Sequence, residues 1–353
     1  MNKALLRLLL ISLLLLTAAG ASLYVYVQYH LDQPVTLAEA VEEQAQPRLL
    51  WAVEKGSNLG QVNRKLHSQG IVSRPKLMAR YANFSGRAAI QAGSYWIEAD
   101  DNARSLLDKF NRGDVIRYQI TFPEGWSFKQ WLAHLELRQV PQFELIAQLS
   151  VDELLALANI ELDHPEGWFF PDTYSYSATD SVLDILGQAH RQMSAVLKKA
   201  WQVRGPDLPY KSAYEALIMA SIIEKETGLA TEREEIAGVF VRRLLRNMRL
   251  QTDPTVIYGM ADSYKGNIRR VHLKQRTPYN TYMIKGLPPT PIAMPSAAAI
   301  DAALHPLPGS SLYFVARGDG GHYFSDSLEE HLRAVQQYQI EHRAQNYQSA
   351  PQQ

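Results

Sequence analysis

The chain has 353 residues, 46% of them hydrophobic and 20% charged, which is typical of a folded protein with two or three modest domains. Lys and Arg together number 36, as do Asp and Glu, so no net charge favours a nucleic-acid partner. The lack of cysteine excludes disulfides, thiol nucleophiles and cysteine-based zinc sites.

The first thirty residues predict a membrane anchor. The run from Leu8 to Val27 carries no charge and reaches the length of about 20 residues that spans a bilayer. Lys3 and Arg7 precede this run, which predicts that the N-terminus stays in the cytoplasm and the rest of the chain is exported. We therefore expect a single-pass anchor within residues 1–31. A cleaved signal peptide with its cleavage site at residues 19–21 is the alternative.

Residues 32–48 contain Glu, Gln and Pro without clear periodicity and predict a tether. Residues 49–114 predict a compact unit with one strand, two helices and a second strand. Its expected elements are a strand at 49–53, helices over 59–66 and near 75–81, a strand at 93–97, and a third helix that ends at Gly113. This order resembles a LysM-type module, a small fold that binds glycans containing N-acetylglucosamine. A spacer without a ligand is the alternative.

Residues 115–343 predict a second domain of mixed helices and strands, so the expected fold class is α+β. Its elements are a half-buried strand over 116–122, a long amphipathic helix over 183–200, helices over 212–227 and 231–247, and a buried strand at 312–316. Residues 251–259 and 279–282 are expected to be ordered loops. The Gln-rich tail, residues 344–353, is expected to be frayed.

The helix Ser212–Thr227 is apolar almost all round and is expected to be buried. Glu226 shares a side of this helix with Ile222 and Ile223, whereas Glu224 lies on nearly the opposite side. A carboxyl group against apolar side chains loses hydration, which raises its pKa and suits a general acid for glycosidic cleavage. A structural ion pair with an arginine is the alternative role for Glu226.

Several common catalytic patterns are missing from the sequence. It contains no H-E-x-x-H and no G-x-S-x-G, and its ten histidines show no metal-ligand spacing. No glycine-rich loop follows a strand as phosphate binding requires. We therefore expect neither a metal nor a cofactor.

Several segments of the second domain resemble the endolytic murein transglycosylase (YceG-like) family. They are residues 166–173, 222–227, 249–259, 279–282 and 286–289, which occur in order within residues 115–340. Enzymes of this kind cut peptidoglycan glycan strands with one carboxyl group that is followed by a hydroxyl residue. Glu226 with Thr227 fits that pairing. The resemblance therefore implies that Glu226 is both catalytic acid and base, and that cleavage leaves a 1,6-anhydro-N-acetylmuramic acid end.

The resemblance also implies the biological setting. The catalytic domain would lie in the periplasm, held to the inner membrane by the anchor, and would cut nascent glycan strands internally to end their elongation. Glycan strands are then the substrate, and peptidoglycan synthases are implied as partners. Nucleic acid is not among the expected partners.

Further residues near Glu226 are expected to bind the sugars. They are Thr227, Gln251, Asp253, Tyr258, Tyr279 and Asn280. Packing is the alternative role for the tyrosines, and stabilisation of a turn before Pro254 is the alternative for Asp253. Two other functions stay open. One is a hydrolytic muramidase that uses Glu226 with a second carboxylate, best Asp253, with Glu166 or Asp172 as further choices. The other is a non-catalytic scaffold that binds glycan and tethers the wall to the membrane.

Overall fold

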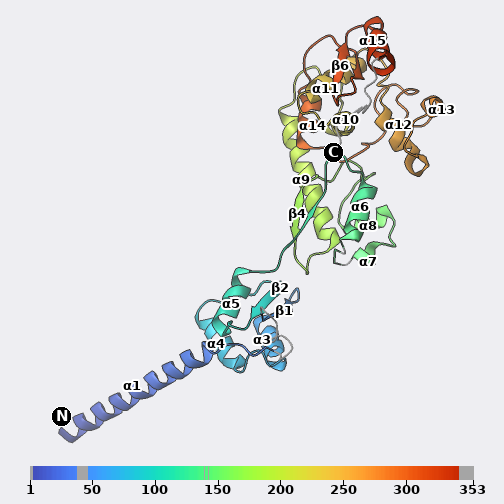
Figure 1. Ribbon diagram of the computed structural model, residues 1–353. Coiled ribbons are helices and arrows are strands. Elements are labelled where there is room, and N and C mark those ends of the chain that lie inside the picture. The colour runs from blue at the N-terminus through green and yellow to red at the C-terminus, as the bar shows by residue number, and fades with distance from the viewer. Residues whose placement is uncertain (1–2, 38–46, 139, 142, 342–353) are drawn as a thin grey trace. The chain divides into compact units, whose positions relative to one another are not determined.

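The computed structural model describes residues 3–37, 47–138, 140–141 and 143–341 (Figure 1). Most of the predicted tether, and the whole of the predicted tail at 344–353, lie outside the described residues. The chain forms two compact units, Met1–Gln119 with Ser175–Asp180, and Ile120–Tyr174 with Ser181–Gln353. In the part that the structure describes, helices predominate over three two-stranded sheets, so the class is mixed α+β.

The first unit begins with a long apolar helix, α1 (Lys3–Leu31). Its segment Leu6–Leu31 is long and apolar enough to cross a membrane. A signal sequence near the N-terminus would meet the same criteria of length and composition. Side chains from Leu6 to Tyr26 are all exposed, whereas Leu31 is buried in the core of the unit. An isolated helix that exposes leucine on every side is stable in hydrocarbon rather than in water.

The rest of the first unit has the predicted order of strand, two helices and strand, followed by the predicted third helix. Its elements are β1 (Arg48–Val53), α3 (Leu59–Ser68), α4 (Pro75–Phe84), β2 (Gly93–Glu98) and α5 (Ala103–Arg112). β1 and β2 pair antiparallel with Trp51 opposite Tyr95, and both rings contact Phe110 of α5. Gly113 ends α5 with φ of 73°, a left-handed conformation that glycine adopts without strain.

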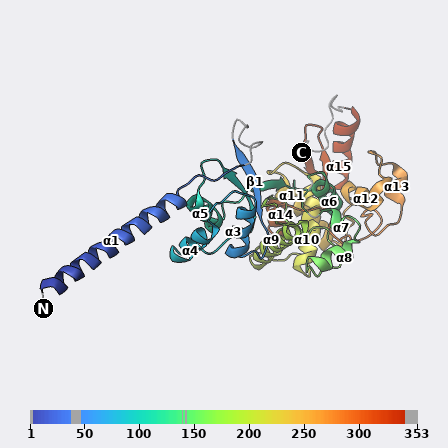
Figure 2. The ribbon, with the colours of Figure 1, turned by 90° about the horizontal axis from the view of Figure 1, so that it is seen from below.

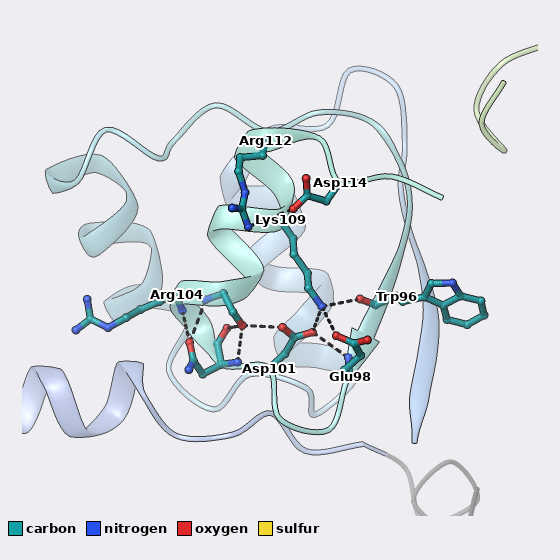
Figure 3. A network of polar contacts seen from close by, with 9 residues as sticks. Trp96, Glu98, Asp101, Arg104, Lys109, Arg112 and Asp114 are labelled. Carbon is teal, nitrogen blue, oxygen red and sulfur yellow. Dashed lines mark hydrogen bonds and ion pairs between the residues drawn. The ribbon is translucent and has the colours of Figure 1, made fainter. Parts of the chain in front are cut away.

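A buried carboxylate fixes the turn between β2 and α5 (Figure 3). Asp101, 4% exposed, accepts hydrogen bonds from the Glu98 amide at 2.9 Å and the Ser105 hydroxyl at 2.7 Å. It also pairs with the Lys109 ammonium at 2.6 Å, which in turn reaches Glu98 and the Trp96 carbonyl. Because every partner lies on β2, α5 or the turn between them, this network joins the strand to the helix.

The second unit surrounds one central helix, α10 (Ala213–Glu226), which contacts α9, α11, α12 and α14 (Figure 2). Its helices are α6 (Phe128–Leu137), α7 (Phe143–Ile146), α8 (Val151–Leu157), α9 (Val182–Gln202), α11 (Arg233–Leu245), α12 (Asp253–Met260), α13 (Arg270–Lys274), α14 (Ala297–Leu304) and α15 (Leu328–Val335). Short helices η1 (Ala261–Ser263) and η2 (Gln336–Glu341) complete the set among the described residues.

Two small sheets accompany these helices. β3 (Tyr118–Thr121) pairs with β4 (Thr173–Tyr176), and β5 (Tyr313–Ala316) pairs antiparallel with β6 (His322–Ser325). The boundary between the two units falls within β3 and β4. β3 is shorter than the strand predicted over residues 116–122. On either side of it, the Ile116 amide donates to the Ser94 carbonyl at 2.7 Å and the Phe122 amide to the Asp172 carbonyl at 3.0 Å.

The expectation of a loop at residues 251–259 was wrong, because most of this segment forms the helix α12. Pro254 occupies one of the first two helical positions, where its fixed φ suits a helix and its missing N–H costs nothing. The β-branched Val256 and Ile257 and the glycine at 259 lower helix propensity, which hid this element in the sequence. Tertiary packing of α12 on α10 outweighs that weak propensity.

Candidate active site

Glu226 is the last residue of α10, and its position follows from the construction of that helix. The Ser212 hydroxyl caps the N-terminus by accepting from the Glu215 amide, and every residue from Ala216 to Glu224 is buried. The Thr227 amide closes the other end on the Ile223 carbonyl. A buried, capped helix holds its final side chain in a fixed place, so Glu226 is presented by a rigid element.

Glu226 meets a hydroxyl group that the sequence analysis did not single out. The Thr252 hydroxyl donates a hydrogen bond to Oε1 of Glu226. Burial raises the pKa of Glu226 to about 7, and the negative charge of Asp253 adds to this rise. The hydrogen bond from Thr252 and the positive charge of Arg243 act in the opposite direction. The carboxyl is therefore poised to gain or lose a proton near neutral pH.

The Thr252 hydroxyl is itself held in place by a buried cluster of threonines. The Thr252 amide donates to the Thr281 hydroxyl at 3.0 Å, and the Thr255 hydroxyl lies 2.9 Å from the same oxygen. The residue before Thr252 is joined to the same segment, because the Gln251 amide donates to the Thr281 carbonyl at 3.2 Å. Gln251 has a positive φ of 54°. The segments at 251–255 and at 281 are thus joined, which directs the Thr252 side chain at Glu226.

Asp253 and Arg243 contribute charge near Glu226. Asp253 is exposed, and its Oδ1 accepts from the Tyr282 hydroxyl at 2.7 Å. Arg243 is 7% exposed and donates to the carbonyls of Leu312 at 2.6 Å and Leu250 at 2.7 Å. No ion pair joins Arg243 to Glu226 in the part of the chain that the structure describes. The arginine therefore supports the backbone around the site and acts on Glu226 through its charge.

Glu224 lies in a separate environment, as the helical spacing predicts. It is 2% exposed, and its Oε2 accepts from the Ser296 amide at 2.9 Å and the Ser296 hydroxyl at 2.5 Å. Ser296 caps α14 through a further hydrogen bond from the Ala299 amide. Glu224 therefore ties α10 to the start of α14, and its carboxylate oxygen is occupied by two donors.

A second buried glutamate lies at the other end of α12. Glu166 is 3% exposed and accepts from the Phe128 amide at 3.0 Å and the Tyr258 hydroxyl at 3.1 Å, one on each oxygen. Burial raises the pKa of Glu166 to about 7. Tyr258 also packs on Tyr279, with ring centroids 5.0 Å apart. Asp253 and Tyr258 are about 7.5 Å apart along α12, so this short helix has one end near Glu226 and the other in contact with Glu166.

The structure divides the remaining predicted residues into two groups. Gln251 and Asp253 flank Thr252 and so lie with Glu226, whereas Tyr258 and Tyr279 lie with Glu166. Thr227 and Asn280 are engaged with backbone. The Thr227 hydroxyl accepts from the Leu229 amide at 3.0 Å. The buried Asn280 amide donates to the carbonyls of residues 272, 273 and 275.

Two contributors to the site were missed in the sequence analysis, namely Thr252 and Arg243. Thr252 lay inside a quoted segment, but its contact with Glu226 joins residues 26 positions apart. Arg243 lies on the helix α11, where its only sequence signal was a positive charge at a position that packs inward. No group of three or more His, Cys, Asp or Glu suited to a metal ion occurs among the described residues.

Thr252 and Asp253 act in opposite directions on the pKa of Glu226, so replacing each should shift that pKa in opposite directions. Thr252→Val removes a hydrogen bond that favours the ionised form, so the pKa of Glu226 should rise, by about one unit for a bond to a charged group. Asp253→Asn removes a negative charge, so the same pKa should fall. Carbon NMR of ¹³C-glutamate-labelled protein, with Glu226→Gln to assign the signal, measures both. Shifts of the same sign in the two variants would contradict this account of the site.

Comparison with known proteins identifies relatives over most of the chain. The chain is 29% identical over 320 residues to the endolytic murein transglycosylase of Bacillus subtilis (strain 168), covering 86% of this chain and 88% of the relative. It is 26% identical over 363 residues to the protein of the same name from Streptococcus pneumoniae serotype 2 (strain D39), covering 93% of this chain and 64% of that relative.

A solved structure and a family model agree with these relatives. The crystal structure of a yceG-like protein from Listeria monocytogenes is similar with a TM-score of 0.53 and 26% identity, over 82% of this chain and 99% of that one. The model of the YceG-like family matches residues 51–337, which include both α10 and the segments that surround Glu226. The protein described here therefore belongs to the YceG-like family.

Proposed function

We propose that the protein is an endolytic lytic transglycosylase of peptidoglycan, with Glu226 as its catalytic acid and base. The observation that carries the proposal is the partly buried carboxyl at the end of α10, whose pKa burial raises to about 7. Such a group is protonated in a large fraction of molecules at neutral pH and can also act as a base in the next step. The relatives named endolytic murein transglycosylases support the choice of substrate.

The reaction needs one carboxyl group in two successive steps. Protonated Glu226 first donates its proton to the glycosidic oxygen that leaves C1 of N-acetylmuramic acid. The resulting carboxylate then accepts the proton of the 6-hydroxyl of the same sugar while that oxygen bonds to C1. The bond to the leaving oxygen breaks, the 1,6-anhydro bond forms, and Glu226 ends in its protonated state with no water consumed.

The contacts of Glu226 suit this cycle. Because the Thr252 hydroxyl donates to Oε1, the proton is best held on Oε2, which leaves one defined oxygen for the substrate. The same hydrogen bond stabilises the carboxylate formed between the two steps. Asp253 opposes ionisation and so keeps the acid form populated. Thr252 and Asp253 are therefore positioning residues that balance the two protonation states.

The hydrolytic alternative requires a second carboxylate that activates water or attacks C1. Glu166 does not suit this role, since it is buried and each of its oxygens already accepts a hydrogen bond. Asp172 accepts from Gln192 and from the Thr173 amide, and it is not among the charged groups that shift the pKa of Glu226. Asp253 is exposed next to the segment that contacts Glu226, so a muramidase using Glu226 and Asp253 remains the second candidate function.

The other parts of the chain are assigned by the same proposal. Residues 1–31 anchor the protein in the inner membrane, residues 49–114 form a LysM-like glycan-binding module, and residues 115–343 form the periplasmic catalytic domain. Cleavage of nascent strands beside the peptidoglycan synthases would end their elongation. A glycan-binding wall tether without activity would share the first two assignments but not the third.

A cleavage assay separates an enzyme from a tether. Full-length protein, purified in detergent, should shorten uncrosslinked glycan strands, and early products should include many strands of intermediate length because cleavage is internal. Chromatography of the strands over time gives the length distribution. Strands that keep their length while the protein binds them would support the tether instead.

A further inference from the structure

The last turn of α1 is built into the core of the first unit. Leu31 is 1% exposed within that core. The Arg104 guanidinium of α5 donates to Asp32 at 2.6 Å and to the Gln28 side chain, and so links α5 to the end of α1. The same guanidinium lies 4.5 Å from the centre of the Tyr81 ring on α4. α4 therefore lies beside the end of α1, as Figures 1 and 2 both show.

The segment that contains α4 carries only positive charge. Residues 71–97 contain Arg74, Lys76, Arg80 and Arg87 and no Asp or Glu. Arg87 pairs with Asp108, whereas the other three side chains are exposed. Among the described residues, no ion pair involves Arg74, Lys76 or Arg80. In a chain whose positive and negative residues are equal in number, this is a local concentration of positive charge next to the end of a membrane-length helix.

The same helix ends in an unusually exposed aromatic residue. Phe84 is the last residue of α4 and is 92% exposed, more than any other large hydrophobic side chain found exposed in the described residues. It follows Tyr81 by three positions and Leu77 by seven, so it continues their side of the helix. Leu77 and Tyr81 pack on the core of the unit, and Phe84 extends that apolar side beyond the protein.

We propose that Arg74, Lys76, Arg80 and Phe84, here called the α4 surface, bind the anionic phospholipid surface into which α1 inserts. This proposal rests on the proposed anchoring of α1. Because the apolar span reaches Leu31 and the unit is fixed to that end, α4 is held at the depth of the lipid headgroups. Arginine and lysine are attracted to anionic headgroups, and an aromatic side chain enters the boundary between headgroups and acyl chains.

This contact has a consequence for the module. A single helix followed by a flexible tether would let the module tumble above the membrane. Two points of attachment, the end of α1 and the α4 surface, instead fix one face of the module toward the lipid. The glycan-binding surface proposed for the module must then lie on its other faces.

Site-directed spin labelling tests the contact directly, since the natural chain has no cysteine to remove. Phe84→Cys and, as a control, Leu50→Cys, which is 52% exposed on β1, are labelled in the full-length protein. Both are reconstituted in vesicles of phosphatidylcholine with phosphatidylglycerol. The label at position 84 should collide more with oxygen, which concentrates in lipid, than with a water-soluble nickel complex, and the label at position 50 should show the reverse. Replacing Arg74, Lys76 and Arg80 by glutamate should make the label at position 84 collide less with oxygen and more with the nickel complex.

Three outcomes would be negative, and they can be told apart. If the protein floats with the vesicles but the label at 84 behaves like the label at 50, the α4 surface does not bind lipid and the inference is overturned. If the protein does not float with the vesicles at all, the anchor itself fails and with it the inference. Equal lipid contact by the glutamate variant would remove the role assigned to the three cations.

Discussion

Replacing Glu226 by glutamine is expected to lower the cleavage rate of glycan strands by about 10²–10⁴-fold, the usual contribution of general acid–base catalysis. Glutamine keeps the shape of the side chain and can still accept the hydrogen bond from Thr252. It has no proton to transfer at neutral pH, so both chemical steps lose their acid and base. The initial rate of strand cleavage, measured over a range of strand concentrations, gives the effect on kcat and KM separately.

Glu224→Gln on the same helix is the matched control. Its amide oxygen can accept the hydrogen bonds from Ser296, so α10 should stay attached to α14. This variant should keep far more activity than Glu226→Gln, with thermal melting to check that both are folded. Loss of activity in Glu224→Gln together with an active Glu226→Gln would reverse the assignment of the two glutamates.

The Glu226→Gln variant is also expected to be more stable than the natural protein at alkaline pH. Folding raises the pKa of Glu226 from 4.5 to about 7, so the folded state holds its proton more tightly than the unfolded state. As the pH rises from 4.5 through 7, ionisation therefore lowers the free energy of unfolding of the natural protein. The full effect of such a shift is about 3 kcal/mol above pH 7, and the glutamine variant does not suffer it.

Chemical denaturation at pH 4.5 and at pH 8, followed by tryptophan fluorescence, measures this difference. The two proteins should differ little at pH 4.5, because Glu226 is then protonated in the folded state and the penalty is small. At pH 8 the variant should have the higher free energy of unfolding. A difference of equal size at both pH values would show that it does not come from ionisation of Glu226. A gain in stability on loss of a catalytic group is the usual trade-off at active sites.

The elements that could be predicted from sequence are those with strong local signals. The helix α10 was predicted within one residue at each end, because its apolar run is bounded by the capping Ser212 and by Gly228. The strand–helix–helix–strand order of the first unit followed from alternating apolar residues and from glycines at the turns. These signals lie within a few residues of one another, so a single sequence contains them.

The site could be predicted only in part, because its contacts join distant positions. Helical spacing separated Glu226 from Glu224, and the structure places the two in different environments. Helical spacing does not predict that the Thr252 hydroxyl contacts Glu226, or that Tyr258 contacts Glu166, which lies 92 positions away in the sequence. α12, which links these two contacts, was missed because its local propensity favours a loop and only packing makes it helical.

The most direct measurement of the central claim is the chemistry of the newly formed sugar ends. The proposal gives the roles of acid and base to one carboxyl at the end of α10, whose pKa burial raises to about 7, and Glu166 has both oxygens engaged in hydrogen bonds. The 6-hydroxyl of the substrate is then the nearest nucleophile, favoured over water by its fixed position. Uncrosslinked strands are digested, treated with borohydride and analysed by mass spectrometry. We expect 1,6-anhydro-N-acetylmuramic acid ends, which are one water lighter than hydrolysed ends and resist reduction. Reducible ends would contradict the transglycosylase assignment and point to a hydrolase that uses Glu226 with Asp253.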